Sequence, residues 1–170
     1  MSKQANFRFS NMPVTLVSGD LLEQKVEVIV NAWNRNVIPW WLLLPSGVSG
    51  AIKKRGGYAP FRELGKFGPI PLGEARWTSA GRLPFKGIIH VAGISLAWRS
   101  SAKAVEQCVK NALGLATDHG VASIAFPLIG AGTGGLKHET AKATILEAAG
   151  SADFPGDIVV VERLKQARAS

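Results

Sequence analysis

The sequence predicts an α/β fold, a three-layer α/β/α sandwich around a mixed, largely parallel central sheet. Short apolar segments rich in β-branched residues alternate along the chain with longer segments of helical spacing. In Ser123–Gly135 (SIAFPLIGAGTGG) an apolar strand runs into a glycine loop, and a helix follows, which is a junction typical of such folds. With 170 residues, of which 46% are hydrophobic, the chain has the size and the apolar content of one packed domain.

The expected strands are short runs in which valine, isoleucine and other apolar residues dominate. In chain order they are Val14–Val17, Glu27–Val30, Glu74–Ser79, Gly87–Ala92, Ser123–Ile129 and Asp157–Val161. The fourth run is continuously apolar apart from His90, as a strand covered on both faces is. This character favours a sheet with helices on both sides.

The expected helices show apolar residues three and four positions apart, or residues that commonly begin and end helices. In chain order they are Ser46–Arg55, Tyr58–Phe67, Ala102–His119 and His138–Ala149. Ser46 is suited to cap the first helix, and Gly56 and Gly57 are suited to end it. Between the second strand and this helix, Asn31–Pro45 is expected to be a long loop that carries the apolar run Val37–Pro45.

Ligands of parallel sheets bind beyond the carboxyl ends of the strands. Three suggestive segments follow expected strands: Gly19-Asp20, Asn31–Ser49 and Gly130–Gly135. We therefore expect them to converge on one cleft.

Composition limits the class of protein. The net charge of +8 attracts anions of any kind. Cys108 is the one cysteine of the chain, so no internal disulfide is expected, and this fits a reducing cytoplasm. The N-terminal residues lack the apolar segment of a secretion signal, and the nine residues of Val37–Pro45 fall far short of the ~20 needed to span a bilayer. No histidines or cysteines have metal-ligand spacing, so we expect no metal site.

Gly130–Gly135 has the chemistry of a phosphate-binding loop. Without Cβ atoms, its backbone can adopt positive φ and point consecutive N–H groups at an anion. The loop also matches G-x-G-x-x-G, and Asp153 follows at the position of a dinucleotide-binding acid, which would indicate a nicotinamide dehydrogenase. Only 35 residues follow the loop, too few for the rest of such a domain, and Asp153 lies in a turn composition. The sequence therefore favours a different phosphate-binding fold.

Taken together, the motifs resemble the macro domain family. The matching segments, in the order of the family, are Gly19–Leu21, Ile29–Asn34, Gly47–Ile52, Gly73–Ala75, Lys86–Val91, Ser123–Pro127 and Gly130–Gly135. We therefore expect one macro-like domain over residues 1–170, with a core at about 14–161 and short flexible termini. Members of the family bind ADP-ribose, and some hydrolyse ADP-ribosyl esters or related derivatives.

The resemblance implies a role for each site residue. Asp20 would accept a hydrogen bond from the adenine amino group beside the backbone N–H of Leu21, and Asn34 would contact the distal ribose and be the catalytic candidate. Two sets of backbone N–H groups would hold the diphosphate from opposite sides. They belong to Gly47, Val48 and Ser49, and to Gly130, Ala131, Gly132, Thr133 and Gly134. Asn31, His90 and Glu74 are expected to be structural, and Lys53–Arg55 to be a solvated helix end.

Three positions depart from hydrolytic members of the resembled family. Those members typically carry three glycines where this chain has Pro45-Ser46-Gly47, many have aspartate in place of Ser49, and a bulky aromatic usually replaces Gly134. In the hydrolytic members, this carboxylate and this aromatic would help to position the attacking water molecule. Their absence here weakens that positioning without excluding catalysis, so the chain can be either a hydrolase or a non-catalytic reader. The loop between Asn34 and Gly47 is also several residues longer than in common members of the family. Its Val37–Pro45 run is interpreted as core packing, a lid over the ligand, or a contact for a partner.

The resemblance thus predicts binding of ADP-ribose, or of a protein or nucleic acid that carries it, without a cofactor and away from membranes. An alternative from another class is a basic nucleic-acid-binding protein, suggested by the pI of about 10.0. No recognised RNA-binding motif supports it.

Overall fold

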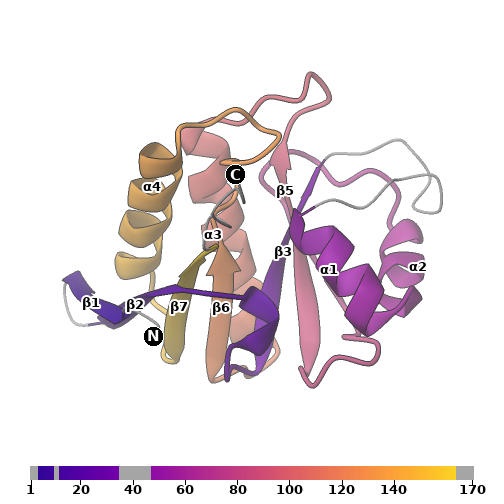
Figure 1. The fold of residues 1–170 in the computed structure, drawn as a ribbon, viewed down its shortest axis with the longest axis horizontal. Helices are drawn as coiled ribbons and strands as arrows, with labels where there is room; N and C mark the ends of the chain where they lie inside the picture. Colours follow the sequence, from indigo (N-terminus) through magenta and orange to yellow (C-terminus); the bar gives the residue numbers. More distant parts are fainter. Residues whose placement is uncertain (1–3, 10–11, 35–46, 164–170) are drawn as a thin grey trace, which may run out of the picture.

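The computed structural model describes residues 4–9, 12–34 and 47–163, and these form a three-layer sandwich around a seven-stranded sheet (Figure 1). The strands lie in the order β1-β2-β7-β6-β3-β5-β4. Their bounds are β1 Gln4–Phe9, β2 Met12–Ser18, β3 Val28–Asn34, β4 Ala75–Thr78, β5 Gly87–Ile94, β6 Ser123–Pro127 and β7 Asp157–Glu162. Strands β2, β7, β6, β3 and β5 are parallel, and the edge strands β1 and β4 are antiparallel to their neighbours. The predicted fold class is confirmed.

Helices cover both faces of this sheet. Their bounds are α1 Gly47–Gly56, α2 Ala59–Gly65, α3 Ala102–Asp118 and α4 His138–Gly150, and a short 3-10 turn, η1, covers Leu21–Glu23. Ser101 caps α3 by accepting from the backbone N–H of Ala104 at 3.2 Å. Among the described residues, no helix combines the length and the apolar character that crossing a membrane requires.

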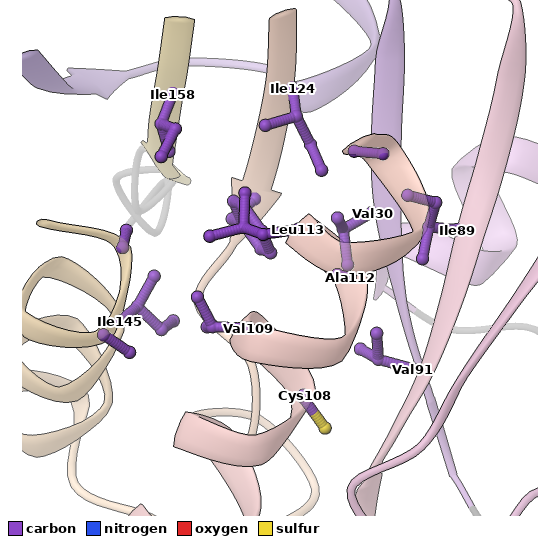
Figure 2. Packing of buried hydrophobic residues seen from close by; sticks show 14 of the residues in the cluster. Val30, Ile89, Val91, Cys108, Val109, Ala112, Leu113, Ile124, Ile145 and Ile158 are labelled. Atoms are coloured by element: carbon purple, nitrogen blue, oxygen red, sulfur yellow. The ribbon is translucent and has the colours of Figure 1, made fainter. Parts of the chain in front are cut away.

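The core consists of two main layers because successive strand residues point to opposite faces of the sheet. In β5, Ile88 packs with Ile52 of α1 and Phe61 of α2, whereas Ile89 packs with Val109 of α3. Figure 2 shows the second layer, where α3 and α4 pack against the sheet. The labelled side chains there are Val30, Ile89, Val91, Cys108, Val109, Ala112, Leu113, Ile124, Ile145 and Ile158. Burial on both faces explains why β5 is apolar in sequence apart from His90.

One strand was not expected at all, and another extends beyond its expected end. Strand β1 lies in the N-terminal segment that we expected to be flexible, and it pairs with β2 from Gln4↔Val17 to Phe9↔Met12. Its polar and charged residues hid the strand in the sequence, but an edge strand tolerates such residues. Strand β3 continues through Asn31 to Asn34, where we expected a loop, because pairing with β5 satisfies its backbone groups.

The other elements lie within a few residues of their expected positions. Strand β6 ends at Pro127, two residues before the expected Ile129, because the chain turns there into the glycine loop. The apolar run Val37–Pro45 and the proposed cap Ser46 lie outside the described residues.

Candidate functional site

The candidate site lies at the carboxyl edge of the parallel strands. Asp20 follows β2, α1 begins after β3, and the loop Gly130–Gly135 follows β6, so all three belong to the same edge. Figure 1 shows the segment between β6 and α4 arching over the edge at which β3 and β5 end. The convergence expected from the sequence is therefore consistent with the strand directions.

Asp20 makes two interactions within the protein. One carboxylate oxygen, Oδ1, accepts from the backbone N–H of Leu22 at 2.8 Å and so caps η1. The other, Oδ2, accepts from Arg55 Nη1 at 2.8 Å. The Asp20 side chain remains 43% exposed, and a carboxylate has about four lone-pair sites, so it can still accept from a ligand amine.

The expectation that Lys53–Arg55 forms a solvated helix end is wrong at Lys53, whereas Lys54 and Arg55 are exposed. Arg55 pairs with Asp20 across 35 residues of sequence. Lys53 is buried, with its ammonium 4.7 Å from the centre of the Phe61 ring and 6.0 Å from that of Trp33. Burial lowers the pKa of Lys53. The run of three basic residues hid these contacts, because successive residues of a helix point to different sides.

The start of α1 supplies one group of backbone donors. The N–H groups of Gly47, Val48 and Ser49 come before any carbonyl that could accept them within the helix, and the helix dipole makes this end positive. Gly47 is exposed and adopts φ +59°, whereas Val48 and Ser49 are half-buried. The Ser49 hydroxyl donates to Asn31 Oδ1 at 2.9 Å, which ties this first turn of α1 to strand β3.

Asn31 and His90 form a buried polar pair beneath that turn. Both are fully buried, and Asn31 Nδ2 lies 3.0 Å from His90 Nδ1. His90 Nε2 lies 2.9 Å from Thr78 Oγ1. Burial lowers the pKa of His90 to about 3, so the ring is neutral. The expectation that these two residues are structural agrees with their burial.

The glycine loop supplies the second group of donors. Gly130 adopts φ +80°, and its carbonyl accepts from the N–H of Leu136 at 3.1 Å. Gly132 and Thr133 are exposed, and Gly134 is buried. Within the described part of the chain, the N–H groups of these three residues have no protein acceptor. They are therefore available to an anion, whereas the Ala131 N–H makes a long bond of 3.4 Å to Leu128.

Ser100 holds the loop in place, a role that we did not predict. Its N–H donates to the Gly134 carbonyl at 2.9 Å, and its hydroxyl donates to the Gly93 carbonyl at 2.7 Å. A Cβ atom on Gly130 would collide with Ser100 Oγ, and one on Gly134 would lie 2.8 Å from Ser100 Cβ. Close backbone packing therefore requires both glycines. In the sequence, Ser100 and Ser101 stand directly before α3, and a serine pair at that place does not by itself indicate a contact with a distant loop.

Asn34 and Leu21 complete the candidate residues. Asn34 is the last residue of β3, and the register against β5 shifts between Trp33 and Asn34. Its position therefore lies at the carboxyl edge of the sheet. Leu21 begins η1, and its side chain is buried in the layer that contains α1 and α2. Its backbone adjoins the exposed Asp20.

Three charged or polar side chains approach one another at the start of α4. His138, Glu139 and Glu162 each place a potential ligand atom within 4.8 Å of the others, a proximity that sequence spacing did not indicate. Lys142 Nζ lies 2.9 Å from Glu139 and 3.7 Å from Glu162. Because the Lys142 ammonium already lies between the two carboxylates, the cluster is interpreted as an ion-pair network at the surface.

Comparisons with known proteins identify the family. The family model described as the Macro domain matches residues 30–145. The chain is 37% identical over 139 residues to an uncharacterised protein of Pyrobaculum aerophilum, with 79% of this chain and 73% of the relative covered. It is 41% identical over 126 residues to a macro domain-containing protein of Streptomyces griseus, covering 70% of this chain and 68% of the relative.

Solved structures agree with this family. An Oceanobacillus iheyensis macrodomain with ADP has a TM-score of 0.82 at 26% identity and covers 98% of this chain and 90% of its own. A point variant of the same macrodomain with ADPR has a TM-score of 0.74 at 27% identity, covering 94% and 89%. A Trypanosoma brucei macrodomain is similar in fold, with a TM-score of 0.73 at 23% identity, covering 87% and 61%.

Proposed function

Because this chain belongs to the macro domain family, we propose that it binds ADP-ribose at the carboxyl edge of its sheet. One observation carries the proposal: two separate turns at that edge offer backbone N–H groups to an anion. They are the start of α1 and the loop after β6. The similar macrodomain structures with ADP and with ADPR support a ligand that contains a diphosphate.

Asp20 is proposed to recognise the adenine. Its carboxylate can only accept hydrogen bonds, and the exocyclic amine of adenine is a donor. The Arg55 guanidinium and the Leu22 N–H fix the orientation of this carboxylate before a ligand arrives. Such a preoriented group loses little freedom on binding. The backbone N–H of Leu21 is proposed to supply a donor beside it.

Asn34 is proposed to bind the hydroxyls of the distal ribose. An amide side chain both donates and accepts, as vicinal hydroxyls require. The position at the end of β3 supports this role, because the diphosphate donors of α1 follow in the chain. In a hydrolase, the same amide would orient the sugar for attack by water.

Hydrolysis of ADP-ribosyl linkages is the second candidate function. The observation in its favour is the Ser49 hydroxyl, which is held at 2.9 Å by Asn31 among the proposed diphosphate donors. A defined hydroxyl at that position can hold a water molecule in place of the missing aspartate. A hydrolase would release label from an ADP-ribosylated protein at a rate that depends on Asn34. A reader would bind the same protein tightly without turnover.

Further aspects of the function are proposed on narrower grounds. ADP-ribose is the ligand or the substrate, carried by a protein or a nucleic acid, and no separate cofactor takes part. A reducing, cytoplasmic compartment is supported by Cys108, a buried free thiol whose pKa burial raises to about 12. This thiol is unreactive, so catalysis through it is not part of the proposal.

Calorimetric titration with ADP-ribose, AMP and NAD tests the proposal. ADP-ribose should bind best, because only this ligand combines the adenine, the diphosphate and a free distal ribose. Asp20→Ala should weaken ADP-ribose binding about tenfold or more, the usual effect of losing a hydrogen bond to a charged group. Preferential binding of NAD would instead favour a dehydrogenase.

Asp20→Asn is the matched variant for this experiment. Asparagine still accepts from the Leu22 N–H and so preserves the cap of η1. Its amide replaces an acceptor by a donor, so the adenine contact should still weaken. If Asp20→Ala weakens binding and Asp20→Asn does not, the effect comes from the cap, and the assigned role of the carboxylate is wrong.

A further inference from the structure

A continuous chain of side-chain hydrogen bonds runs beneath the proposed diphosphate site. It starts at Thr78 on β4, passes through His90 on β5 and Asn31 on β3, and ends at Ser49 on α1. The three distances along it are 2.9, 3.0 and 2.9 Å. Thr78, His90 and Asn31 are buried, whereas Ser49 is half-buried on the first turn of α1. Only Ser49, at the end of this chain, belongs to the proposed ligand site.

The protons of this chain can be assigned from its buried end. The Thr78 hydroxyl donates to the Ser79 carbonyl at 3.0 Å, so it must accept from His90 Nε2. His90 therefore carries its proton on Nε2, and Nδ1 accepts from the amide of Asn31. This orients the Asn31 oxygen toward Ser49, whose hydroxyl donates to it. Every donor thus points in the same direction, from Ser49 toward the Ser79 carbonyl.

We propose that His90 is a positioning residue for the diphosphate-binding turn of α1, acting through Asn31 and Ser49. This inference rests on the proposed function. His90 is fully buried and cannot touch a ligand, but its Nδ1 atom decides which way the Asn31 amide faces. The Asn31 oxygen in turn anchors Ser49, one of the residues that offer backbone N–H groups. Reversal of the amide would face its NH₂ group toward the Ser49 hydroxyl and remove this anchor.

The assignment has a consequence for ligand recognition. The one proton of the Ser49 hydroxyl is committed to Asn31, so toward a ligand this oxygen can act only as an acceptor. A phosphate oxygen is itself an acceptor, which leaves the backbone N–H groups of the first turn to hold the phosphate. The Ser49 oxygen is then suited to a donor, such as a ribose hydroxyl or a water molecule.

Two isosteric substitutions separate the two faces of the imidazole. In His90→Asn, the side-chain oxygen can take the place of Nδ1 and still accept from Asn31. In His90→Gln, the terminal amide can replace Nε2 and still donate to Thr78, but the acceptor for Asn31 is lost. We expect His90→Gln to weaken ADP-ribose binding about tenfold, and His90→Asn to recover most of that loss. The amide NMR shifts of Val48 and Ser49 should move in His90→Gln and far less in His90→Asn.

A double-mutant cycle distinguishes positioning from general destabilisation. In a Ser49→Ala background, His90→Gln should add little further loss of ADP-ribose affinity, because the connection is already broken. Additive losses would overturn the proposal. His119→Gln is the matched histidine control, since His119 stacks on Trp77 and takes no part in the chain. It should leave both the affinity and the α1 amide shifts unchanged.

The unmodified protein provides a test that needs no variant and no ligand. Nitrogen-15 NMR of the His90 ring should report a neutral ring with the proton on Nε2, and a proton on Nδ1 would overturn the inference. If the tautomer and the amide shifts are as expected but ADP-ribose does not bind, the proposed function fails and the positioning of α1 stands. If ADP-ribose binds but the cycle is additive, the positioning role fails alone.

Discussion

His90 illustrates how a single polar residue can be stable inside an apolar strand. Its neighbours in β5, Ile89 and Val91, are fully buried, and so is the imidazole itself. Both ring nitrogens are hydrogen-bonded, to Asn31 and to Thr78, which compensates the cost of burying them. The ring is accommodated as a neutral group, and the protonated form would leave one N–H without an acceptor.

Acid should therefore destabilise the protein through His90. The pKa of this ring is about 3 in the folded chain, against an ordinary value of 6.5, so the unfolded chain binds a proton that the folded chain does not. The free energy of unfolding should fall by up to about 1.4 kcal/mol for each pH unit as the pH drops below 6.5. Urea unfolding at pH 7, 6 and 5 measures this slope above the range in which carboxylates titrate.

His90→Asn is the control for that acid dependence, because asparagine does not titrate. Its slope between pH 6.5 and 5 should be shallower than that of the unmodified protein. His119 and His138 are present in both proteins, so the difference between the two slopes reports the change at position 90. Equal slopes would show that His90 does not stay neutral in the folded state.

At the level of elements, the loop after β6 combines two kinds of glycine. A Cβ atom on Gly134 would lie 2.8 Å from the Gly130 carbonyl oxygen, a backbone atom that cannot easily move. A Cβ atom on Gly132 would meet nothing within 4 Å. Gly134 is thus needed for packing, whereas Gly132 is exposed where the proposed diphosphate would lie.

Alanine substitutions should separate these two roles. Gly134→Ala should lower the free energy of unfolding by about 1–3 kcal/mol, because the loop must shift away from Ser100. Gly132→Ala should change it by less than about 0.5 kcal/mol, yet it should weaken ADP-ribose binding by crowding the donors. Urea unfolding and calorimetry on the same samples provide both numbers. If Gly132→Ala has no effect on affinity, the diphosphate does not lie against that part of the loop.

The sequence predicted elements better than it predicted contacts. Periodicity and capping residues located each α-helix of the described residues within a few positions, since these signals are local. The continuation of β3 through Asn31 was missed because it depends on β5, a distant part of the chain. The ion pair between Asp20 and Arg55 and the burial of Lys53 were missed for the same reason. Pairing across the fold has no signature in a single segment.

At the scale of the whole molecule, the order of strands explains why three loops far apart in sequence could be expected at one edge of the sheet. Five adjacent strands are parallel, so the loops that follow them share one edge regardless of their separation in sequence. The fold class and the approximate location of the candidate site therefore followed from the alternation of strands and helices. The buried chain from Thr78 to Ser49 did not, because its members belong to four different elements.

The net charge of +8 offers a final test between the two classes of anionic ligand. Several basic residues form ion pairs with carboxylates, including Arg55, Lys86 and Lys110. At these positions the positive charges are therefore partly compensated within the protein. A single-stranded RNA bound through about six phosphate contacts would lose roughly 300-fold in affinity between 50 and 200 mM salt. ADP-ribose held by backbone N–H groups should lose less than about tenfold in affinity over the same range, because few counterions are released.

Calorimetry with ADP-ribose and fluorescence anisotropy with a labelled single-stranded RNA, each at both salt concentrations, make the comparison. Tight RNA binding with the steep dependence, together with weak binding of ADP-ribose, would favour the nucleic-acid class, since a diphosphate held by fixed dipoles does not respond to salt in that way.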